Sequence, residues 1–573
     1  MDFQRLILFV IFSMSGVFLF QAWQKENAPP APPKPVASIT APAEKKSDVP
    51  SAVPAAASNG AATGNVPTTA GVPGATSATP AATSSELFTV KTDLFEAKIN
   101  TLGGVIEEVA LKEHRDGADK SKPYLVLMKT KDRTHVAQSG LIGPGLPNHN
   151  TAYSKVSSNT DMGNADTLEV RLSAPNATNA PNGQGGKTDL VYTFKRGSYI
   201  VDVGYDVTNG SDVAITPTAY FHLHRDTKVT GSENGMVGIF HGPIVYSELE
   251  KYKKIDFKDI EKAKKNLYTA NTDNGWVGMV EHYFVNAWLP KAGTKREVYT
   301  TKEEGDIYRA GLKTAVGTIA PGATAKVNVP IFLGPQEQDK LAAAAPGLEI
   351  VVDYGIFSFL AAPMFWLLKW FHGLVGNWGW AIILLTILIK GVFYPLNAKA
   401  GRSMGKMKLV GPKLKEIQTR FADDRVKLNT AMMELYKKEK INPLGGCLPI
   451  VIQIPVFISL YWVLIAAVEL RHAPWALWIK DLSGPDPFYV LPVLYAITAF
   501  LQSKLQPPAP GMDPMQQKVL QYMPVAFAVM FIFFPAGLVL YWTVSNILQI
   551  AQQWQINKML AKENAAVVTA LKR

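Results

Sequence analysis

The sequence is poor in the features that mark disulfide-rich, nucleotide-driven or repeat-built proteins. Its 573 residues include one cysteine, Cys447, so no disulfide can form within the chain. A lone cysteine beside an apolar segment is best interpreted as a small packing residue. The phosphate-binding pattern Gly-x-x-x-x-Gly-Lys-Ser/Thr is absent, which argues against a P-loop nucleotide motor. Internal repeats and paired interrupted spans, which favour a transporter, are also missing from the sequence.

The amino-terminal part divides into an apolar segment and a low-complexity linker. Residues 6–20 are apolar, follow Arg5, and lack a convincing small-x-small cleavage site after them. We therefore predict that residues 1–25 form a transmembrane anchor with its amino terminus inside, with a cleaved signal peptide as the alternative. Residues 26–85 consist largely of Pro, Ala, Ser, Thr and Gly, which cannot bury enough apolar area to fold. They are predicted to be a disordered tether.

Residues 86–346 contain runs in which apolar and polar side chains alternate. This period of two, with Asn-Gly and Gly-Pro breaks between runs, predicts an antiparallel β sandwich or barrel. One helix-like stretch, 257–266, interrupts the pattern. The alternating runs are 87–99, 188–194, 199–207 and 325–332.

From residue 347 onward the sequence is dominated by apolar segments. Residues 347–376 combine tryptophans with Pro363, Lys369 and His372, which favours an amphipathic helix on the bilayer surface, with a spanning helix as the alternative. Residues 377–557 are predicted to form a helical membrane core. Its five predicted spans are 378–395, 444–466, 488–505, 520–534 and 537–556.

The charge distribution predicts how these spans cross the membrane. The formal net charge is +11, and twelve basic residues fall in 396–443 alone. Residues 467–487 hold only Arg471 and Lys480. The positive-inside rule therefore places 396–443 and the basic tail 558–573 in the cytoplasm. With the anchor this gives six spans, both termini inside and a translocated β domain.

The cytoplasmic segment 396–443 has a pattern of its own. Apolar residues recur at spacings of three and four over 407–421 and again over 428–435, and Asp424 can cap the second helix. An antiparallel helical hairpin is expected. Its basic face either only enforces orientation or docks anionic lipid, ribosomal RNA or a partner protein. The candidate docking residues are Lys406, Lys408, Lys413, Lys415, Arg420, Arg425 and Lys427.

Lys390 lies inside the first of the five spans, where no acidic residue accompanies it. An ammonium at that depth costs at least about 2.5–3.5 kcal/mol, which makes it a candidate functional residue. It either faces a wet cavity open to the cytoplasm or snorkels past Pro395, about 7 Å further along a helix. The spans contain further polar residues, for which hydrogen bonding between helices is the plainer explanation. These are Thr386, Gln453, Ser459, Gln502, Thr543, Ser545, Asn546 and Gln549.

His222 and His224 are a conceivable metal pair, because alternate residues of a strand share one face. The sequence offers no evident third ligand nearby. We therefore interpret both as core or surface histidines, and we expect neither a metal site nor a cofactor.

Several motifs of the membrane core resemble the YidC/Oxa/Alb family of membrane protein insertases, in its Gram-negative form with a large periplasmic domain. The resemblance is strong over 350–557 and weaker in the anchor, linker and β domain. The motifs are Lys390-Gly-Val-Phe-Tyr-Pro-Leu, Asn442-Pro-Leu-Gly-Gly-Cys-Leu-Pro449, Gln453-Ile-Pro-Val-Phe, Asp513-Pro-Met-Gln-Gln-Lys518 and Phe534-Pro-Ala-Gly-Leu-Val-Leu-Tyr-Trp-Thr-Val-Ser-Asn546.

The resemblance implies a hydrophilic groove open to cytoplasm and lipid and closed on the outside. Its basic residue, typically arginine, corresponds to Lys390, which keeps the charge but lacks the planar fork of arginine. Thr386 matches a substrate-contacting position, and Trp542 stands where the family usually has tyrosine. The implied groove residues are Lys390, Thr386, Gln453, Ser459, Gln502, Tyr541, Trp542, Ser545 and Asn546.

The resemblance also implies the fold of the β domain and the activity of the whole chain. Residues 26–346 would be periplasmic, with a β supersandwich like that of sugar mutarotases, although fold alone does not imply function. The chain would insert and help fold proteins of the bacterial inner membrane, alone or with the Sec translocon, and would not be an enzyme. Its partners would be nascent inner-membrane proteins, the Sec translocon, anionic lipids and the ribosome, and not DNA. The alternative is a polar-groove transporter or channel with a carbohydrate-binding periplasmic domain.

Overall fold

The computed structural model describes the β domain and most of the helical core. The described residues all fall in one compact unit, Val49–Arg573. The predicted anchor, nearly all of the predicted linker, Cys447 and the end of the basic tail lie outside them. The described ranges are 85–117, 119–176, 186–228, 240–263, 267–421, 424–439, 448–505 and 514–571.

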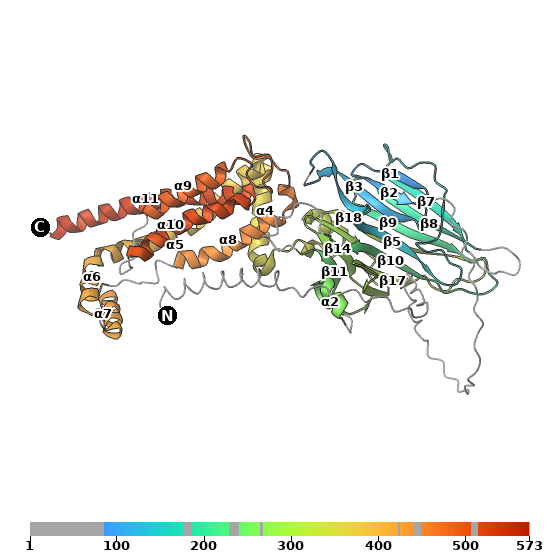
Figure 1. Cartoon of the computed structure of the whole chain (residues 1–573), viewed down its shortest axis with the longest axis horizontal. Coiled ribbons are helices and arrows are strands. Elements are labelled where there is room, and N and C mark those ends of the chain that lie inside the picture. The colour runs from blue at the N-terminus through green and yellow to red at the C-terminus, as the bar shows by residue number, and fades with distance from the viewer. Residues whose placement is uncertain are drawn as a thin grey trace, which may run out of the picture. The chain divides into compact units, whose positions relative to one another are not determined.

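The β domain consists of two nine-stranded antiparallel sheets (Figure 1). The strands of the first sheet are, in spatial order, β1 (Leu87–Lys91), β2 (Phe95–Asn100), β3 (Val105–Arg115), β4 (Pro123–Lys129), β5 (Thr134–Ile142), β10 (Thr218–Asp226), β17 (Ile307–Ala315), β16 (Arg296–Lys302) and β13 (Asn271–Thr272). The strands of the second are β12 (Lys251–Lys254), β11 (Gly242–Ser247), β14 (Trp276–Glu281), β15 (Phe284–Trp288), β18 (Thr324–Pro335), β9 (Ile200–Thr208), β8 (Lys187–Lys195), β7 (Thr167–Pro175) and β6 (Ser154–Lys155).

The two sheets pack face to face, because alternate side chains of their strands are buried between them. In β9 the buried side chains begin at Val201 and recur at every second residue to Val207. Contacts join the sheets directly: the rings of Phe221 in β10 and Trp288 in β15 lie 5.1 Å apart. The predicted antiparallel sandwich is confirmed, and the predicted helix at 257–266 is α2 (Phe257–Lys262).

One predicted strand run differs from the structure. The run 87–99 is two strands, because the chain turns between Lys91 and Phe95. The Thr92 hydroxyl accepts a hydrogen bond from the Phe95 amide at 3.0 Å and holds this turn. A side chain that binds its own backbone in this way competes with strand pairing, and hydrophobic alternation does not reveal it.

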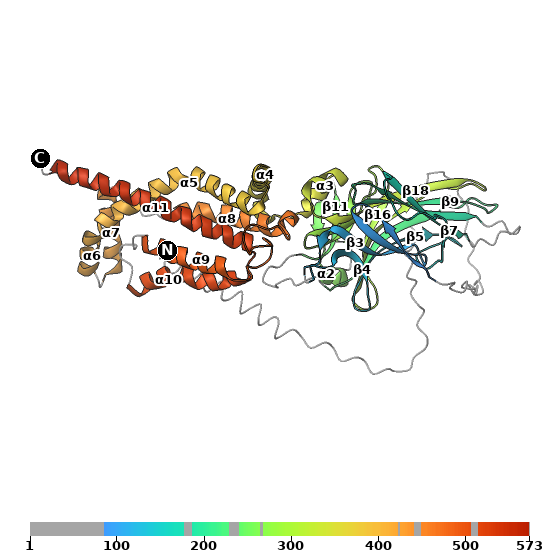
Figure 2. The same ribbon diagram turned by 90° about the horizontal axis from the view of Figure 1, so that it is seen from above.

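The helical region follows a short connection from the β domain (Figures 1 and 2). Its α-helices are α3 (Gln338–Ala344), α4 (Ser358–Val375), α5 (Trp378–Leu409), α6 (Gly411–Arg420), α7 (Arg425–Lys438), α8 (Leu448–Ala466), α9 (Val490–Leu505), α10 (Pro514–Met530) and α11 (Ala536–Leu571). Short 3-10 helices lie at Leu348–Val351, Gly355–Phe357, Val468–Leu470 and Phe531–Phe533.

Helix α4 packs against α5 and α8 and runs across their direction (Figures 1 and 2). Its buried residues Ala361, Met364, Phe365 and Leu368 share one helical face, whereas Trp366 and other large apolar residues are exposed. This arrangement suits the predicted surface helix. By length and composition, Ser358–Val375 and Trp378–Ser403 are both apolar enough to cross a membrane, and three shorter helices are also apolar. The number of spans stays a prediction.

Helix α5 continues well beyond the predicted span, through Pro395 to Leu409. Apolarity ends near Pro395, but the helix does not, because its polar continuation still packs against α11. The predicted cytoplasmic hairpin therefore consists of α6 and α7 after this extension. Asp424 caps α7 as predicted, because its side chain accepts hydrogen bonds from the Val426 and Lys427 amides.

The segment that joins α8 to α9 is ordered by a buried aspartate. Asp486 accepts hydrogen bonds from the indole of Trp478 at 3.0 Å and from the amide of Leu491, in the first turn of α9, at 2.7 Å. The same segment also contacts the start of α11: the Ala536 amide donates to the Gly484 carbonyl at 2.7 Å. Both contacts fix the ends of helices that carry candidate site residues.

Candidate functional site

Helices α5 and α11 run side by side in the same direction along the core (Figures 1 and 2). Gly537 lies against Ile382 near the start of both helices, and Gly401 lies against Ile556 further along. A Cβ atom at Gly401 would come within 2.8 Å of the Ile556 side chain. Small residues at such points let two helices approach closely, so that side chains between them can meet.

Lys390 lies in this seam between α5 and α11. The residue is 7% exposed, and its ammonium donates a hydrogen bond to the side-chain oxygen of Gln549 at 3.2 Å. Its backbone carbonyl accepts a hydrogen bond from Gln552, also at 3.2 Å. Among the residues that the structure describes, no carboxylate pairs with the ammonium. Lys390 is therefore a buried cation held by neutral amides.

Four of the implied groove residues form hydrogen bonds within the core. Thr386 is 0% exposed, and its hydroxyl donates to the Ile382 carbonyl of its own helix at 2.7 Å. Ser459 is also buried and donates to the Pro455 carbonyl at 2.7 Å. Tyr541 is buried as well, and its hydroxyl accepts a long hydrogen bond of 3.5 Å from Gln453. Contact of these residues with a substrate stays a prediction.

Trp542 belongs to an aromatic cluster contributed by several elements. Its ring stacks on Phe531 with centroids 4.0 Å apart and on Phe457 of α8 with centroids 5.1 Å apart. Phe534 and Tyr495 complete the cluster around it. This end of the core is therefore filled by rings, whereas the region around Lys390 holds amides.

The remaining predicted groove residues are half-buried. The Asn546 side chain forms a hydrogen bond with Tyr495 of α9. Ser545 lies beside it, and Gln502 lies near the end of α9. The hydrogen bonds of Gln549 and Gln552 to Lys390 were not predicted, although residues 546, 549 and 552 follow one another at helical spacing.

Three of the seven candidate docking side chains are described, and each has a near neighbour. Lys413 pairs with Glu439 at 2.7 Å, Lys427 pairs with Asp424 at 3.2 Å, and Arg420 lies over the Phe421 ring. These groups are exposed, so the pairs contribute little to stability. The side chains of Lys406, Lys408, Lys415 and Arg425 lie outside the described part, and docking stays a prediction.

His222 and His224 belong to a hydrogen-bonded network in the β domain. The two ring nitrogens of His222 contact Tyr299 and Gln138, each at 2.8 Å, and His224 contacts Gln138 at 3.2 Å. Burial holds the pKa of His222 well below its usual value, so the ring is neutral. Within the described ranges, no three His, Cys, Asp or Glu side chains are grouped as metal ligands would be.

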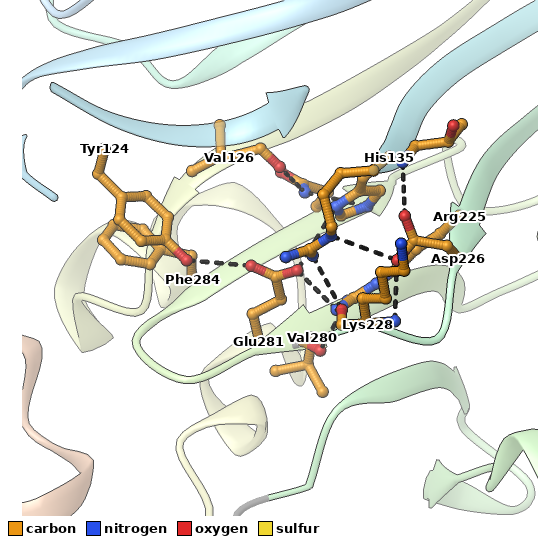
Figure 3. A network of polar contacts seen from close by, with 12 residues as sticks. Tyr124, Val126, His135, Arg225, Asp226, Lys228, Val280, Glu281 and Phe284 are labelled. Carbon is orange, nitrogen blue, oxygen red and sulfur yellow. Dashed lines mark hydrogen bonds and ion pairs between the residues drawn. The ribbon is translucent and has the colours of Figure 1, made fainter. Parts of the chain in front are cut away.

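Figure 3 shows a second buried network in the same domain. Arg225 is fully buried and pairs with Glu281 at 2.6 Å, while the Tyr124 hydroxyl donates to the other carboxylate oxygen at 3.0 Å. His135 lies 3.7 Å from Glu281, but burial and the Arg225 charge lower its pKa to about 3. The buried charges of this network are thus paired, Arg225 with Glu281 and Arg133 with Asp226, beside a neutral imidazole, which indicates a structural role.

A cavity of about 360 Å³ lies at another part of the β domain. Its walls come from β8, β9 and the segments around Pro290, Pro330 and 344–346. Its charged groups include Lys195 and Asp202, which pair with each other at 3.0 Å. It lacks the buried, uncompensated charge that distinguishes the α5–α11 seam.

Comparison with known proteins identifies the family to which both parts of the chain belong. The family model described as 60Kd inner membrane protein matches residues 370–563, and the YidC periplasmic domain model matches residues 87–367. The membrane protein insertase YidC of Cupriavidus necator is 48% identical over 578 residues, which cover 99% of this chain and 100% of the relative. That of Aromatoleum aromaticum is 45% identical and covers 100% of both chains.

Among solved structures, a crystal structure of an active YidC insertase with its first transmembrane domain resolved covers 82% of this chain and 92% of its own, with 18% identity and a TM-score of 0.36. The sequence relatives match this chain from end to end. The family predicted from the motifs is confirmed, and the chain belongs to the YidC family of membrane protein insertases.

Proposed function

We propose that this chain inserts proteins into the bacterial inner membrane by drawing an acidic segment of the substrate toward Lys390. Its end-to-end similarity to proteins named membrane protein insertases supports the activity. The observation that carries the residue assignment is that the Lys390 ammonium lies against the Gln549 amide and not against a carboxylate. A buried cation without a counterion can still attract an anion, because Coulomb attraction strengthens as the surrounding dielectric falls.

The depth of Lys390 suits this role. It lies twelve residues after the start of α5, which is about 18 Å along a helix. In a hydrocarbon core about 30 Å thick, a tail that enters from the cytoplasm would therefore meet Lys390 after roughly 12 Å. The ammonium then offsets part of the free energy of removing an Asp or Glu from water. A wet groove leading to this point from the cytoplasm is part of the proposal.

Apolar burial supplies the driving force for the rest of the step. An apolar substrate helix that leaves water for lipid gains about 25 cal/mol per Å² of apolar surface. The aromatic cluster around Trp542 offers it an apolar wall beyond Lys390. As the helix moves sideways into lipid, its short tail is carried outward, and no nucleotide is consumed.

The membrane topology and the partners belong to the same proposal. The charge pattern supports six spans with both termini in the cytoplasm and the β domain in the periplasm. The orientation of α4 across α5 and α8 supports a helix that lies in the membrane surface. The basic faces of α6 and α7 would bind anionic lipid or the ribosome. The Sec translocon is the proposed partner for longer substrates.

Reconstitution in vesicles of pure lipid tests the proposed role of Lys390. Two versions of one short-tailed substrate would be compared, with either Asp or Asn in the tail. Lys390→Ala should lower the Asp-to-Asn ratio of insertion rates roughly tenfold, equivalent to about 1.4 kcal/mol, whereas Lys390→Arg should preserve it. Lys399→Ala is the matched control, because it removes a charge from an exposed position of the same helix. An unchanged ratio in Lys390→Ala would contradict the assignment.

A further inference from the structure

We infer that Gln549 is a positioning residue that holds the Lys390 ammonium inside the core until a substrate carboxylate replaces its amide. The inference rests on the proposed role of Lys390 and adds the group that keeps that cation available. In the α5–α11 seam, one lysine contacts two glutamines of the neighbouring helix.

Helix α11 contacts Lys390 at both its side chain and its backbone. Gln549 accepts from the ammonium, and Gln552, three residues later, donates to the carbonyl of the same lysine, each at 3.2 Å. Lys390 and Gln549 lie at similar distances from the starts of their helices. Lys390 follows the start of α5 by twelve residues, about 18 Å, and Gln549 follows the start of α11 by thirteen, about 20 Å. A lysine near the end of an apolar run would otherwise extend toward the surface water. The contact with Gln549 opposes that movement.

An amide suits this task better than the alternatives. A carboxylate at position 549 would neutralise the ammonium and leave little attraction for a substrate. An apolar side chain would leave the buried ammonium without an acceptor, which is costly. An amide oxygen satisfies the ammonium without cancelling its charge. Because a primary amide also carries two donors, Gln549 can turn and donate to the carboxylate that displaces it. Both the resting and the loaded arrangement are then hydrogen-bonded.

The decisive variant is Gln549→Glu in the full-length protein, reconstituted in vesicles of pure lipid. A carboxylate of nearly the same size would occupy Lys390, so the Asp-to-Asn ratio of insertion rates should fall roughly tenfold, equivalent to about 1.4 kcal/mol. The insertion rate of the Asn-tailed substrate should change less than about twofold, because its neutral tail does not depend on the charge of Lys390. A purely structural role would lower both rates together.

The matched control is Gln553→Glu. Gln553 lies one turn further along α11 and donates to Asn557 at 2.9 Å, away from Lys390. The same charge change at this position should leave the ratio unaltered. If Gln549→Glu also leaves it unaltered while Lys390→Gln lowers it, Gln549 is a bystander and the inference is overturned. If Lys390→Gln leaves the ratio unaltered too, the proposed role of Lys390 has failed first.

Exchanging the two side chains keeps the inference testable even if Gln549→Glu does not fold. Lys390→Gln with Gln549→Lys places the ammonium on α11 and the amide on α5. If the seam requires only one cation held by one amide, it should not matter which helix carries each group. The exchanged protein should then recover at least half of the loss in the Asp-to-Asn ratio of insertion rates that Lys390→Gln alone causes. An exchanged protein that inserts the Asn-tailed substrate but shows no preference would overturn the inference.

Discussion

The β domain and the helical core both bury charged side chains, but they surround them with different partners. In the β domain, Arg225 pairs with Glu281, and Tyr124 donates to the same carboxylate (Figure 3). In the helical core, the Lys390 ammonium contacts the neutral amide of Gln549, and no carboxylate pairs with it in the described part of the chain. The first arrangement balances its charge within the protein. The second holds a cation whose charge no described residue neutralises.

The difference teaches that burial alone does not identify a functional charge in this chain. Arg296 makes the same point within the β domain, because its guanidinium donates to backbone carbonyls that include those of Asp273 and Lys291. Its partners are fixed parts of nearby loops, so its role is to hold them. A buried charge becomes a candidate site where its partner is neutral and can be exchanged.

The largest expected effect comes from breaking the buried ion pair of Arg225 and Glu281. Arg225→Met leaves the Glu281 carboxylate buried without its cation, which should lower the free energy of unfolding by about 3–5 kcal/mol. Denaturant unfolding of the purified full-length protein in detergent would measure the loss. Arg225→Met with Glu281→Met should lose less than the single variant, because no charge is left alone.

Arg171→Met is the control for this prediction. Arg171 also pairs with carboxylates, those of Asp189 and Asp206, but it is partly exposed at the sheet surface. Its loss should lower the free energy of unfolding by about 1 kcal/mol or less. Equal effects at Arg171 and Arg225 would mean that burial of the Arg225 pair is not what sets its contribution.

The sequence predicted the strands and helices better than it predicted which side chains would contact one another. Period-two alternation identified β9 and β18 correctly, because burial of every second side chain depends on local pattern alone. The pair of Arg225 and Glu281 joins strands far apart in the chain, and no local pattern contains that information. The turn at Thr92 was missed for a related reason, because one hydroxyl decides it.

The candidate site shows the same division. Lys390 could be identified from the sequence because a charge in an apolar run is a local anomaly. Gln549 was recognised as a polar residue of the last span. It was not recognised as the partner of Lys390, because that contact depends on how α5 and α11 pack. Thr386 shares a helical face with Lys390 as predicted by its spacing, yet its hydroxyl is buried against its own helix. Spacing determines the face and leaves the neighbour undetermined.

A change of pH should affect a third kind of buried charge, the Glu469 carboxyl in the segment after α8. Burial raises its pKa from 4.5 to about 7, and Glu337 adds to the shift, while nearby Lys369 is paired with Asp339. At a pH between these two pKa values, Glu469 is protonated in the folded protein and ionised in the unfolded chain. Stability should therefore fall as pH rises through this range, by about 1–2 kcal/mol for a half-buried side chain.

Thermal unfolding of the wild type and of Glu469→Gln, followed from about pH 5 to about pH 8, would measure this effect. The variant carries a permanently neutral side chain of similar size, so its stability should lack this part of the pH dependence. Identical pH profiles for the two proteins would show that Glu469 ionises at no cost to the folded state.

At Asp424, an exposed carboxylate acts locally. It caps α7 by accepting hydrogen bonds from Val426 and Lys427, and those bonds lower its pKa. Asp424→Ala should destabilise the α6–α7 hairpin by about 1 kcal/mol, whereas Asp424→Ser should retain most of the cap. Hydrogen exchange at the first turns of α7 would measure the difference. Uniform loss of protection throughout the core would contradict a local role.

The smallest expected effect concerns Thr386, one turn before Lys390 on α5. Its buried hydroxyl already donates to the Ile382 carbonyl, so Thr386→Val should preserve both packing and the charge environment of Lys390. We expect insertion rates to change less than about twofold, with the Asp-to-Asn ratio unaltered, because the backbone carbonyl keeps its own helical partner. Thr386→Ser, which retains the hydroxyl, is the control. If Thr386→Val slowed insertion at least as much as Lys390→Ala while Thr386→Ser did not, the hydroxyl would have to contact the substrate. The seam between α5 and its neighbours would then have to open during insertion, because Thr386 is fully buried.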